Sequence, residues 1–265
     1  MSELDQEQGK LNEEKEKSIG REIWDNVKSL VKIFVTFGII TSVAYQPFKI
    51  PSGSMIPTLL VGDFLLCDKF TYGYTNDSFR MWQFTFPLPK FKHRLMKTHD
   101  PKQGDVVVFR NPKDEDKNYI KRIIGMPGDK IQIINGVVNI NDKPCEITEE
   151  GSYSIMDRGN YDTYTKYTEK LPNGYKHVFI KKFPFGQGSL DNVGPFNVPE
   201  GHYFVMGDNR DNSQDSRVMK YVGFIPLERI MGQAKWIFFS SSCEWYQVFK
   251  WFFSMRFERF FTSIL

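Results

Sequence analysis

Hydrophobic and polar positions divide this chain into four regions. Residues 1–28 are rich in Glu and Lys and poor in apolar groups, which is typical of a solvated tail. A run without any charge covers residues 33–48, and short β-branched and aromatic runs bounded by Gly, Pro, Asn and Asp follow to about residue 242. Residues 243–265 are again different, because aromatic side chains dominate them.

The uncharged run predicts a transmembrane anchor at residues 29–48. A helix that is apolar on every side needs lipid or a deep core around it. A cleavable signal peptide is the alternative, but the leader is long and acidic, and no small-x-small cleavage pattern follows the run. Lys and Arg are more frequent before the run than after it, so the N-terminus is expected in the cytoplasm and the larger part outside.

The central region predicts a mainly β fold built from antiparallel sheets, because strand-like runs fill it and long helical patterns are absent. We expect a core from residues 49–128 and 201–242, with a second β lobe, residues 129–200, inserted between its halves. The Asn-Gly pair in "INGVV" predicts a tight hairpin.

The last region predicts an amphipathic helix over residues 243–265 that lies in the membrane interface and contacts lipid. Its aromatic side chains fit one broad helical face, with Lys250, Arg256 and Arg259 on the remainder. A helix docked on the β body is the alternative. The aromatic positions are Trp245, Phe249, Phe252, Phe253, Phe257, Phe260 and Phe261.

The charge and the cysteine spacing argue against nucleic-acid binding and against a metal site. The formal net charge is +3 and the basic residues are scattered among acids, which argues against nucleic-acid binding. Cys67, Cys145 and Cys243 lie far apart, without a CxxC pair or a histidine at ligand spacing. We therefore expect no metal and no cofactor, and we expect a monomer.

The stretch "PSGSMIPTL" offers two hydroxyl groups, those of Ser52 and Ser54. A hydroxyl is a weak nucleophile unless a base takes its proton. In an extended segment both serines face the same way, and Gly53 between them lets another backbone approach. The four histidines (His93, His99, His177 and His202) lie in stretches without other site-like features, and a GxSxG elbow is missing.

A lysine offers another base. "NYIKRIIGMPGD" reads as a strand in which Lys121 and Arg122 point to opposite faces. Arginine stays protonated, whereas burial lowers the pKa of a lysine readily. A decrease of roughly 3 units makes about half of the amines neutral near pH 7.4. The alternative is an exposed lysine with no chemical role.

The stretch "MGDNRDNSQDSR" is dense in acids but does not have the spacing of an EF-hand, since the required Gly and Glu positions hold Ser216 and Val222. A polar turn that bonds its own backbone is one interpretation. In the other, the Ser213 hydroxyl holds a neutral amine while Asp and Arg side chains pair to brace the loop.

The three stretches "PSGSMIPTL", "NYIKRIIGMPGD" and "MGDNRDNSQDSR" follow the apolar run in this order. Together they resemble the conserved sequence motifs, or boxes, of bacterial type I signal peptidases. The resemblance implies a membrane-bound serine endopeptidase with a Ser/Lys dyad that removes signal peptides from exported pre-proteins after a small-x-small motif. Ser54 matches the nucleophile and Lys121 the general base. Ser52 and the Ser54 backbone N–H match the oxyanion hole, and Ser213 matches the serine that orients the lysine. Related peptidases of the endoplasmic reticulum carry His where this chain has Lys121.

The resemblance also implies a location in the bacterial inner (plasma) membrane, which the chain crosses once, with the catalytic part on the outer, periplasmic side. The residues that match the walls of shallow pockets for small side chains are Phe48, Ile50, Pro51, Met55, Leu59, Tyr119 and Ile120. Those that match the bracing loop are Asp208, Arg210, Asp211, Asp215 and Arg217.

Two rival hypotheses remain. A self-cleaving Ser/Lys repressor would need a DNA-binding module where this chain has an acidic tail and an apolar run. A non-catalytic, membrane-anchored β-rich binding module would leave the serines and the lysine inert, and it predicts that Lys121 is not buried.

Overall fold

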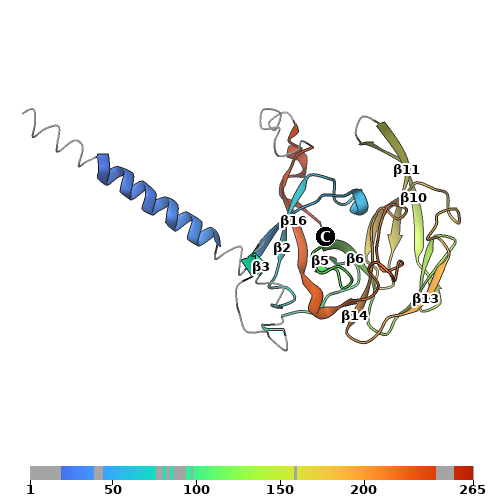
Figure 1. Cartoon of the computed structure of the whole chain (residues 1–265). Helices are drawn as coiled ribbons and strands as arrows, with labels where there is room; N and C mark the ends of the chain where they lie inside the picture. The colour runs from blue at the N-terminus through green and yellow to red at the C-terminus, as the bar shows by residue number, and fades with distance from the viewer. Residues whose placement is uncertain are drawn as a thin grey trace, which may run out of the picture. The chain divides into compact units, whose positions relative to one another are not determined.

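The computed structural model describes residues 19–38, 44–75, 80–81, 84–85, 94–96, 98–157, 160–242 and 254–264. The chain forms two compact units, Met1–Ala44 and Tyr45–Leu265. The described part of the first unit contains a helix over residues 19–38, drawn in blue (Figure 1). Its apolar side chains are exposed, Phe34 to 71% and Trp24 to 60%.

The helix differs from the expected anchor in its limits. Within the described residues, none of the helices has both the length and the hydropathy required for a membrane span. The helix begins before residue 29, and Tyr45–Lys49 form strand β1, so the prediction that a helix continues to Phe48 is wrong. β1 pairs with β2 (Asp63–Asp68), and Pro47 within it is incompatible with a helix interior.

The second unit is built on an eight-stranded antiparallel sheet (Figure 1). Its strand order is β1-β2-β16-β5-β6-β14-β15, with β17 paired to β16. The further strands of this sheet are β5 (Val106–Arg110), β6 (Asn118–Gly125), β14 (His202–Met206), β15 (Ile225–Pro226), β16 (Ile230–Ser240) and β17 (Thr262–Ser263). The expectation of a mainly β, antiparallel fold is therefore confirmed.

Residues 129–200 form two smaller sheets within the same unit. One has the order β13-β7-β8-β9 and comprises Val193–Asn197, Lys130–Ile134, Val137–Ile140 and Lys143–Pro144. The other has the order β10-β11-β12 and comprises Glu146–Asp157, Asn160–Lys170 and Lys176–Lys181. The predicted hairpin lies between β7 and β8, where Asn135 and Gly136 both have positive φ, as a tight two-residue turn requires. A further pair, β3 (Arg80–Met81) and β4 (Phe84–Thr85), forms a sheet of its own.

The central sheet is buried on both faces. Successive side chains of a strand alternate between faces, and those of β5 enter two different cores. Val106 and Val108 belong to one core, and Val107 and Phe109 belong to another. The first core also contains Met55, which anchors the serine-containing segment to the sheet.

The C-terminal segment is not the expected helix. Residues 243–253 lie outside the described residues, and in 254–264 the chain forms a short 3-10 turn, η5 (Phe257–Arg259), followed by β17. Arg259 donates to both carboxylate oxygens of the buried Asp63, at 3.1 and 2.6 Å, and Ile264 enters the core. These contacts hold the segment against the β body, so the prediction of an interfacial helix is wrong for residues 254–264.

Candidate functional site

Ser54 lies in a tight turn, η1 (Gly53–Met55), which the buried side chains of Met55 and Leu59 anchor to the core. Ser52 immediately before it is extended, with φ −135° and ψ 155°. The expected extended segment therefore stops at Ser52. The two hydroxyl oxygens still lie 3.5 Å apart, and Ser54 is 9% exposed.

Lys121, which lies on β6, contacts the turn that contains Ser54. β6 pairs with β5 so that Lys121 lies opposite Val107. Its Nζ lies 2.7 Å from Ser54 Oγ and 2.8 Å from the Ile120 carbonyl oxygen, and the residue is 4% exposed. Tyr119 covers the amine, with its ring centre 5.5 Å from Nζ. A non-catalytic module predicted an unburied lysine, so this burial argues against that rival.

Burial changes the acid–base properties of this amine. Removing the ammonium ion from water lowers the pKa of Lys121 to about 8, although Asp215 and Asp208 raise it and Arg217 lowers it further. At neutral pH a substantial minority of the amines is therefore uncharged, on the order of one in ten at pH 7. A neutral amine at 2.7 Å can accept the hydroxyl proton of Ser54.

The loop after β14 holds the serine turn in place. The Asn209 backbone N–H donates to the Ser54 carbonyl oxygen at 3.0 Å, and its side-chain Nδ2 donates to the Gly53 carbonyl oxygen at 3.1 Å. A Cβ atom at Gly207 would lie 2.5 Å from the Ser54 carbonyl oxygen, so only glycine permits this approach. We expected Gly53 to allow another part of the backbone to approach closely. In the structure, Gly207 is the glycine that allows the close approach to the Ser54 carbonyl oxygen.

Sequence reasoning did not single out Asn209 or Gly207, although both stand in the quoted loop. A Gly-Asp-Asn run directly after an apolar strand was the available signal. Ser213, which was singled out, contributes to the same cavity as Lys121; its Oγ is buried, and its hydroxyl helps to lower the pKa of Asp215 without a hydrogen bond of normal geometry to any described residue. The structure therefore places Ser213 at the site without a bond to the amine.

Asp208 joins the site to a buried network of charges that includes Arg122 and His177. Its Oδ1 accepts from Arg122 Nε at 2.9 Å, and its Oδ2 accepts from Arg122 Nη2 at 2.8 Å and from the Thr58 hydroxyl at 2.5 Å. Burial raises the pKa of Asp208, but the neighbouring Arg122 outweighs it and holds the pKa below its ordinary value. Arg122 follows Lys121 on β6, and neighbouring side chains of a strand point to opposite faces. One face of β6 therefore brings Lys121 to Ser54, and the other brings Arg122 to Asp208.

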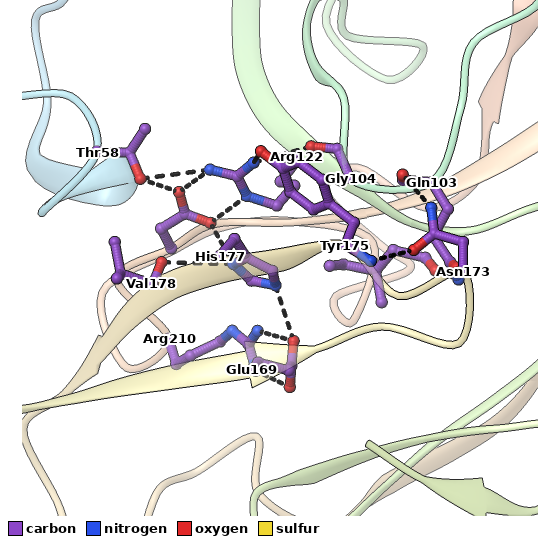
Figure 2. A network of polar contacts seen from close by, with 12 residues as sticks. Thr58, Gln103, Gly104, Arg122, Glu169, Asn173, Tyr175, His177, Val178 and Arg210 are labelled. Atoms are coloured by element: carbon purple, nitrogen blue, oxygen red, sulfur yellow. Dashed lines mark hydrogen bonds and ion pairs between the residues drawn. The ribbon is translucent and has the colours of Figure 1, made fainter. Parts of the chain in front are cut away.

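The network continues into the β10-β11-β12 sheet. His177 on β12 lies 3.6 Å from Asp208 and 3.0 Å from Glu169 on β11, which also pairs with Arg210 at 2.6 Å (Figure 2). Burial raises the pKa of Glu169, but Arg210 and His177 outweigh it and bring the pKa to about 2. The loop is thus braced mainly by partners outside it, and this set, Arg122, Glu169 and His177, was not predicted.

The remaining acids of the loop are also paired. Arg217 donates to both oxygens of Asp215 at 2.8 Å, and the Gly207 N–H donates to the same carboxylate at 3.0 Å. Asp211 accepts from the buried Lys181 at 2.9 Å. Each of these contacts restricts the loop that carries Asn209.

A cavity of about 770 Å³ opens over Ser54 and Lys121. Of the seven residues expected to form pocket walls, Pro51, Tyr119 and Ile120 line it. Ile50, Met55 and Leu59 are 2%, 0% and 0% exposed and lie in the core, while Phe48 packs against that core. The other residues around the cavity are Ser52, Gly53, Lys117, Asn118, Ser189, Leu190, Asp211, Asn212, Ser213, Gln214, Val218 and Tyr221.

An alcohol oxygen in contact with a desolvated amine, at the floor of a cavity, is the arrangement of a Ser/Lys hydrolase. The profile of the family described as "Signal peptidase, peptidase S26" matches residues 23–239. The chain belongs to this signal peptidase family, as its three sequence boxes indicated.

Relatives with curated names agree. "Signal peptidase I" of Rickettsia typhi is 43% identical over 230 residues, which cover 83% of this chain and 84% of the relative. That of Rickettsia canadensis is 45% identical over 205 residues, 76% and 74% of the two chains. A crystal structure of a signal peptidase I from Enterococcus faecalis covers 51% of this chain and 97% of its own at 24% identity, with a TM-score of 0.30, which is too low to bear on the fold.

Proposed function

We propose that this chain removes N-terminal signal peptides from exported pre-proteins, with Ser54 as nucleophile and Lys121 as general base. Family membership supports the reaction. The observation that carries the residue assignment is the 2.7 Å contact between Ser54 Oγ and a buried amine whose pKa is lowered to about 8.

The reaction follows from this contact. Ser54 Oγ attacks the carbonyl carbon of the scissile peptide bond while its proton passes to Lys121 Nζ. Lys121 then returns that proton to the leaving amine as the C–N bond breaks, which leaves the signal peptide as an ester on Ser54. A water molecule gives its proton to Lys121, attacks the ester carbonyl and restores the Ser54 hydroxyl when Lys121 returns the proton.

The developing oxyanion needs donors. We assign this role to the Ser52 hydroxyl and the Ser54 backbone N–H, because the two hydroxyl oxygens are 3.5 Å apart and Ser52 lies in the cavity. One such donor contributes about 10²–10³ in rate in other proteases. Ser52→Ala should therefore slow cleavage without abolishing it.

Ser213 is proposed to orient the amine. A neutral Lys121 uses its lone pair for the Ser54 hydroxyl and one N–H for the Ile120 carbonyl oxygen, which leaves one N–H. The Ser213 hydroxyl in the same cavity has an acceptor to offer. We assign bracing to the paired acids and arginines of its loop, because their contacts do not reach Ser54 Oγ directly.

Selection of small side chains is assigned to the apolar part of the cavity. Pro51, Tyr119 and Ile120 would contact the residues before the scissile bond, and the buried Ile50, Met55 and Leu59, with Phe48, would support that wall from the core. Signal peptides end in a small-x-small segment, which suits a shallow apolar wall.

We also propose a membrane-attached monomer in the bacterial plasma membrane, with the N-terminus cytoplasmic and a single span. The exposed apolar side chains of the helix over 19–38 support contact with lipid. The proposed catalytic core comprises residues 49–128 and 201–242, and residues 129–200 form the inserted lobe.

The test is cleavage of a secretory precursor by the detergent-solubilised full chain, followed by sequencing of the new N-terminus. Ser54→Ala and Lys121→Met should each reduce the rate at least about 10³-fold, because the reaction loses its nucleophile or base. Ser152→Ala, an exposed serine on β10, is the matched control and should cleave normally. Cleavage by Ser54→Ala at the wild-type rate would refute the assignment.

A further inference from the structure

Part of the cavity has no role in the reaction described above. Three of the exposed polar side chains around it, those of Ser189, Asn212 and Gln214, come from the segments next to Asp191 and Asp211 and line the cavity together with Ser54 and Lys121. We refer to these three residues as the polar lining. Gln214 extends to the apolar wall, since its Oε1 lies 3.5 Å from the Tyr119 hydroxyl. The polar lining is therefore continuous with the part of the cavity assigned to the signal peptide.

One buried lysine joins the two segments that carry the polar lining. Lys181 Nζ donates to Asp191 Oδ1 at 2.6 Å and to Asp211 Oδ1 at 2.9 Å, and its side chain is 2% exposed. Asp191 follows Ser189 and Leu190, and Asp211 precedes Asn212. A single ammonium group thus fixes the spacing between the two segments.

The second oxygens of the same two carboxylates complete the arrangement. Asp191 Oδ2 accepts from the N–H groups of Gly186 and Gly188 at 2.9 and 3.0 Å. Asp211 Oδ2 accepts from the N–H groups of Lys182 and Phe183 at 2.9 and 3.0 Å. At Gly188 a Cβ atom would lie 2.7 Å from Asp211 Oδ1 and 2.9 Å from Asp191 Oδ1, so the loop can only close with glycine there. These contacts therefore hold the segment that contains Ser189 in a fixed position at the edge of the cavity.

The chemistry of the polar lining differs from that of the signal-peptide side. A signal peptide ends in small and apolar residues, which suit Pro51, Tyr119 and Ile120. A hydroxyl and two carboxamides are suited instead to the N–H and C=O groups of an extended chain, whatever its side chains. A secreted protein begins with a sequence that varies from one substrate to the next, so only its backbone offers constant partners.

We propose that the polar lining binds the backbone of the substrate residues that follow the scissile bond, and that Lys181 is the positioning residue that holds it. This inference rests on the proposed function and adds the substrate segment that the cavity accepts beyond the cleavage point.

The experiment uses two peptide series and the full chain in detergent. In one series the signal-peptide side is constant and one to four residues follow the scissile bond. In the other the mature side is constant and the signal-peptide side is lengthened. The measurement is kcat/KM for each peptide. In the wild type, extension on the mature side should raise kcat/KM about tenfold in total, as two or three backbone hydrogen bonds would.

The double variant Asn212→Ala/Gln214→Ala removes two exposed carboxamides and should reduce that gain to about twofold or less, while the gain on the signal-peptide side stays. Lys181→Met should show the same selective loss although it leaves the polar lining chemically intact, and Lys181→Arg should retain more of the gain. A merely structural role for Lys181 would lower kcat/KM for all peptides by one factor.

Lys182→Met is the matched control, because Lys182 is exposed, pairs with Asp162 and does not line the cavity. The proposal is overturned if the folded double variant keeps the full mature-side gain, whether or not Lys181→Met folds. A wild type that cleaves no peptide in either series refutes the proposed function itself, and this inference with it.

Discussion

As the proposed general base, Lys121 can accept a proton only while its amine is uncharged, so the activity should follow its protonation. Its pKa lies at about 8 in the folded chain against an ordinary value of 10.5. We expect kcat/KM to rise about tenfold per pH unit below pH 8 and to level off above it. A profile that is flat between pH 6 and 8 would contradict the role of Lys121.

The same shift predicts a change in stability. The unfolded chain binds a proton at Lys121 that the folded chain has released between pH 8 and 10.5. In that window the free energy of unfolding of the wild type should therefore rise with pH relative to Lys121→Met, which cannot titrate there. Urea unfolding of both proteins at several pH values measures the difference.

Asn209 should affect the rate through the position of Ser54. It is 1% exposed, and its Nδ2 donates to the Gly53 carbonyl oxygen at 3.1 Å. We expect Asn209→Ala to lower kcat about tenfold to 100-fold, since small displacements of a nucleophile are costly, with an unchanged pH midpoint. Asn139→Ala is the control, because Asn139 also donates to a backbone carbonyl oxygen, that of Val137, at 3.0 Å. Equal losses in both variants would argue against a positioning role.

At the scale of elements, the C-terminal turn and strand stabilise the loop that follows Ser54. Arg259 donates to the Thr58 carbonyl oxygen at 3.0 Å as well as to Asp63, which is 0% exposed. Arg259→Ala should lower the free energy of unfolding by about 2 kcal/mol, because a buried carboxylate loses its strongest donor.

The comparison for Arg259 is an exposed ion pair. Lys170 and Glu146 lie 3.0 Å apart with side chains 41% and 75% exposed. Lys170→Ala should change the free energy of unfolding by no more than about 1 kcal/mol. Urea unfolding of the two variants gives both values. A loss of stability in Lys170→Ala that exceeds the loss in Arg259→Ala would contradict this interpretation of the C-terminal segment.

Local sequence patterns predicted the strands well. They gave the wrong secondary structure where a contact with a residue distant in sequence determines the conformation. The alternation of Lys121 and Arg122 on β6 and the turn at Asn135 and Gly136 are properties of neighbouring residues, and both could be derived from the sequence. The aromatic spacing near the C-terminus suggested a helix because it contains no information about Asp63, which binds Arg259 from 196 positions away.

The same limit applies to the candidate site. Ser54 and Lys121 could be singled out because each stands in a distinctive box, and 67 positions separate them in sequence. The network of Arg122, Asp208, His177 and Glu169 could not, because it forms only when three parts of the chain meet, and buried charges of this kind leave no periodic pattern.

At the scale of the whole molecule, membrane attachment is the remaining expectation to test. The helix over 19–38 exposes Phe34, Val35 and Phe37 to 71%, 55% and 60%. We expect the full chain to stay with the membrane fraction after an alkaline wash. Phe34→Lys combined with Val35→Lys should release it, because each lysine opposes insertion by about 2.5–3.5 kcal/mol. Release of the wild type would contradict an anchored enzyme.

Orientation can be tested separately on spheroplasts, whose inner membrane is intact and whose periplasmic face is open to an added protease. If the N-terminus is cytoplasmic, an external protease should digest the unit Tyr45–Leu265 or its tags while a tag before residue 19 stays protected until the membrane is opened.

The pairing of β5 with β6 has a further consequence. Val107 stands opposite Lys121 and Val106 opposite Arg122. A slip of one position would turn every side chain of β6 to the other face and would bring a guanidinium, which never gives up its proton, to Ser54. The net charge and the composition would be unchanged, yet the proposed general base would be lost. The alignment of two neighbouring strands is therefore as much a part of the catalyst as the serine itself.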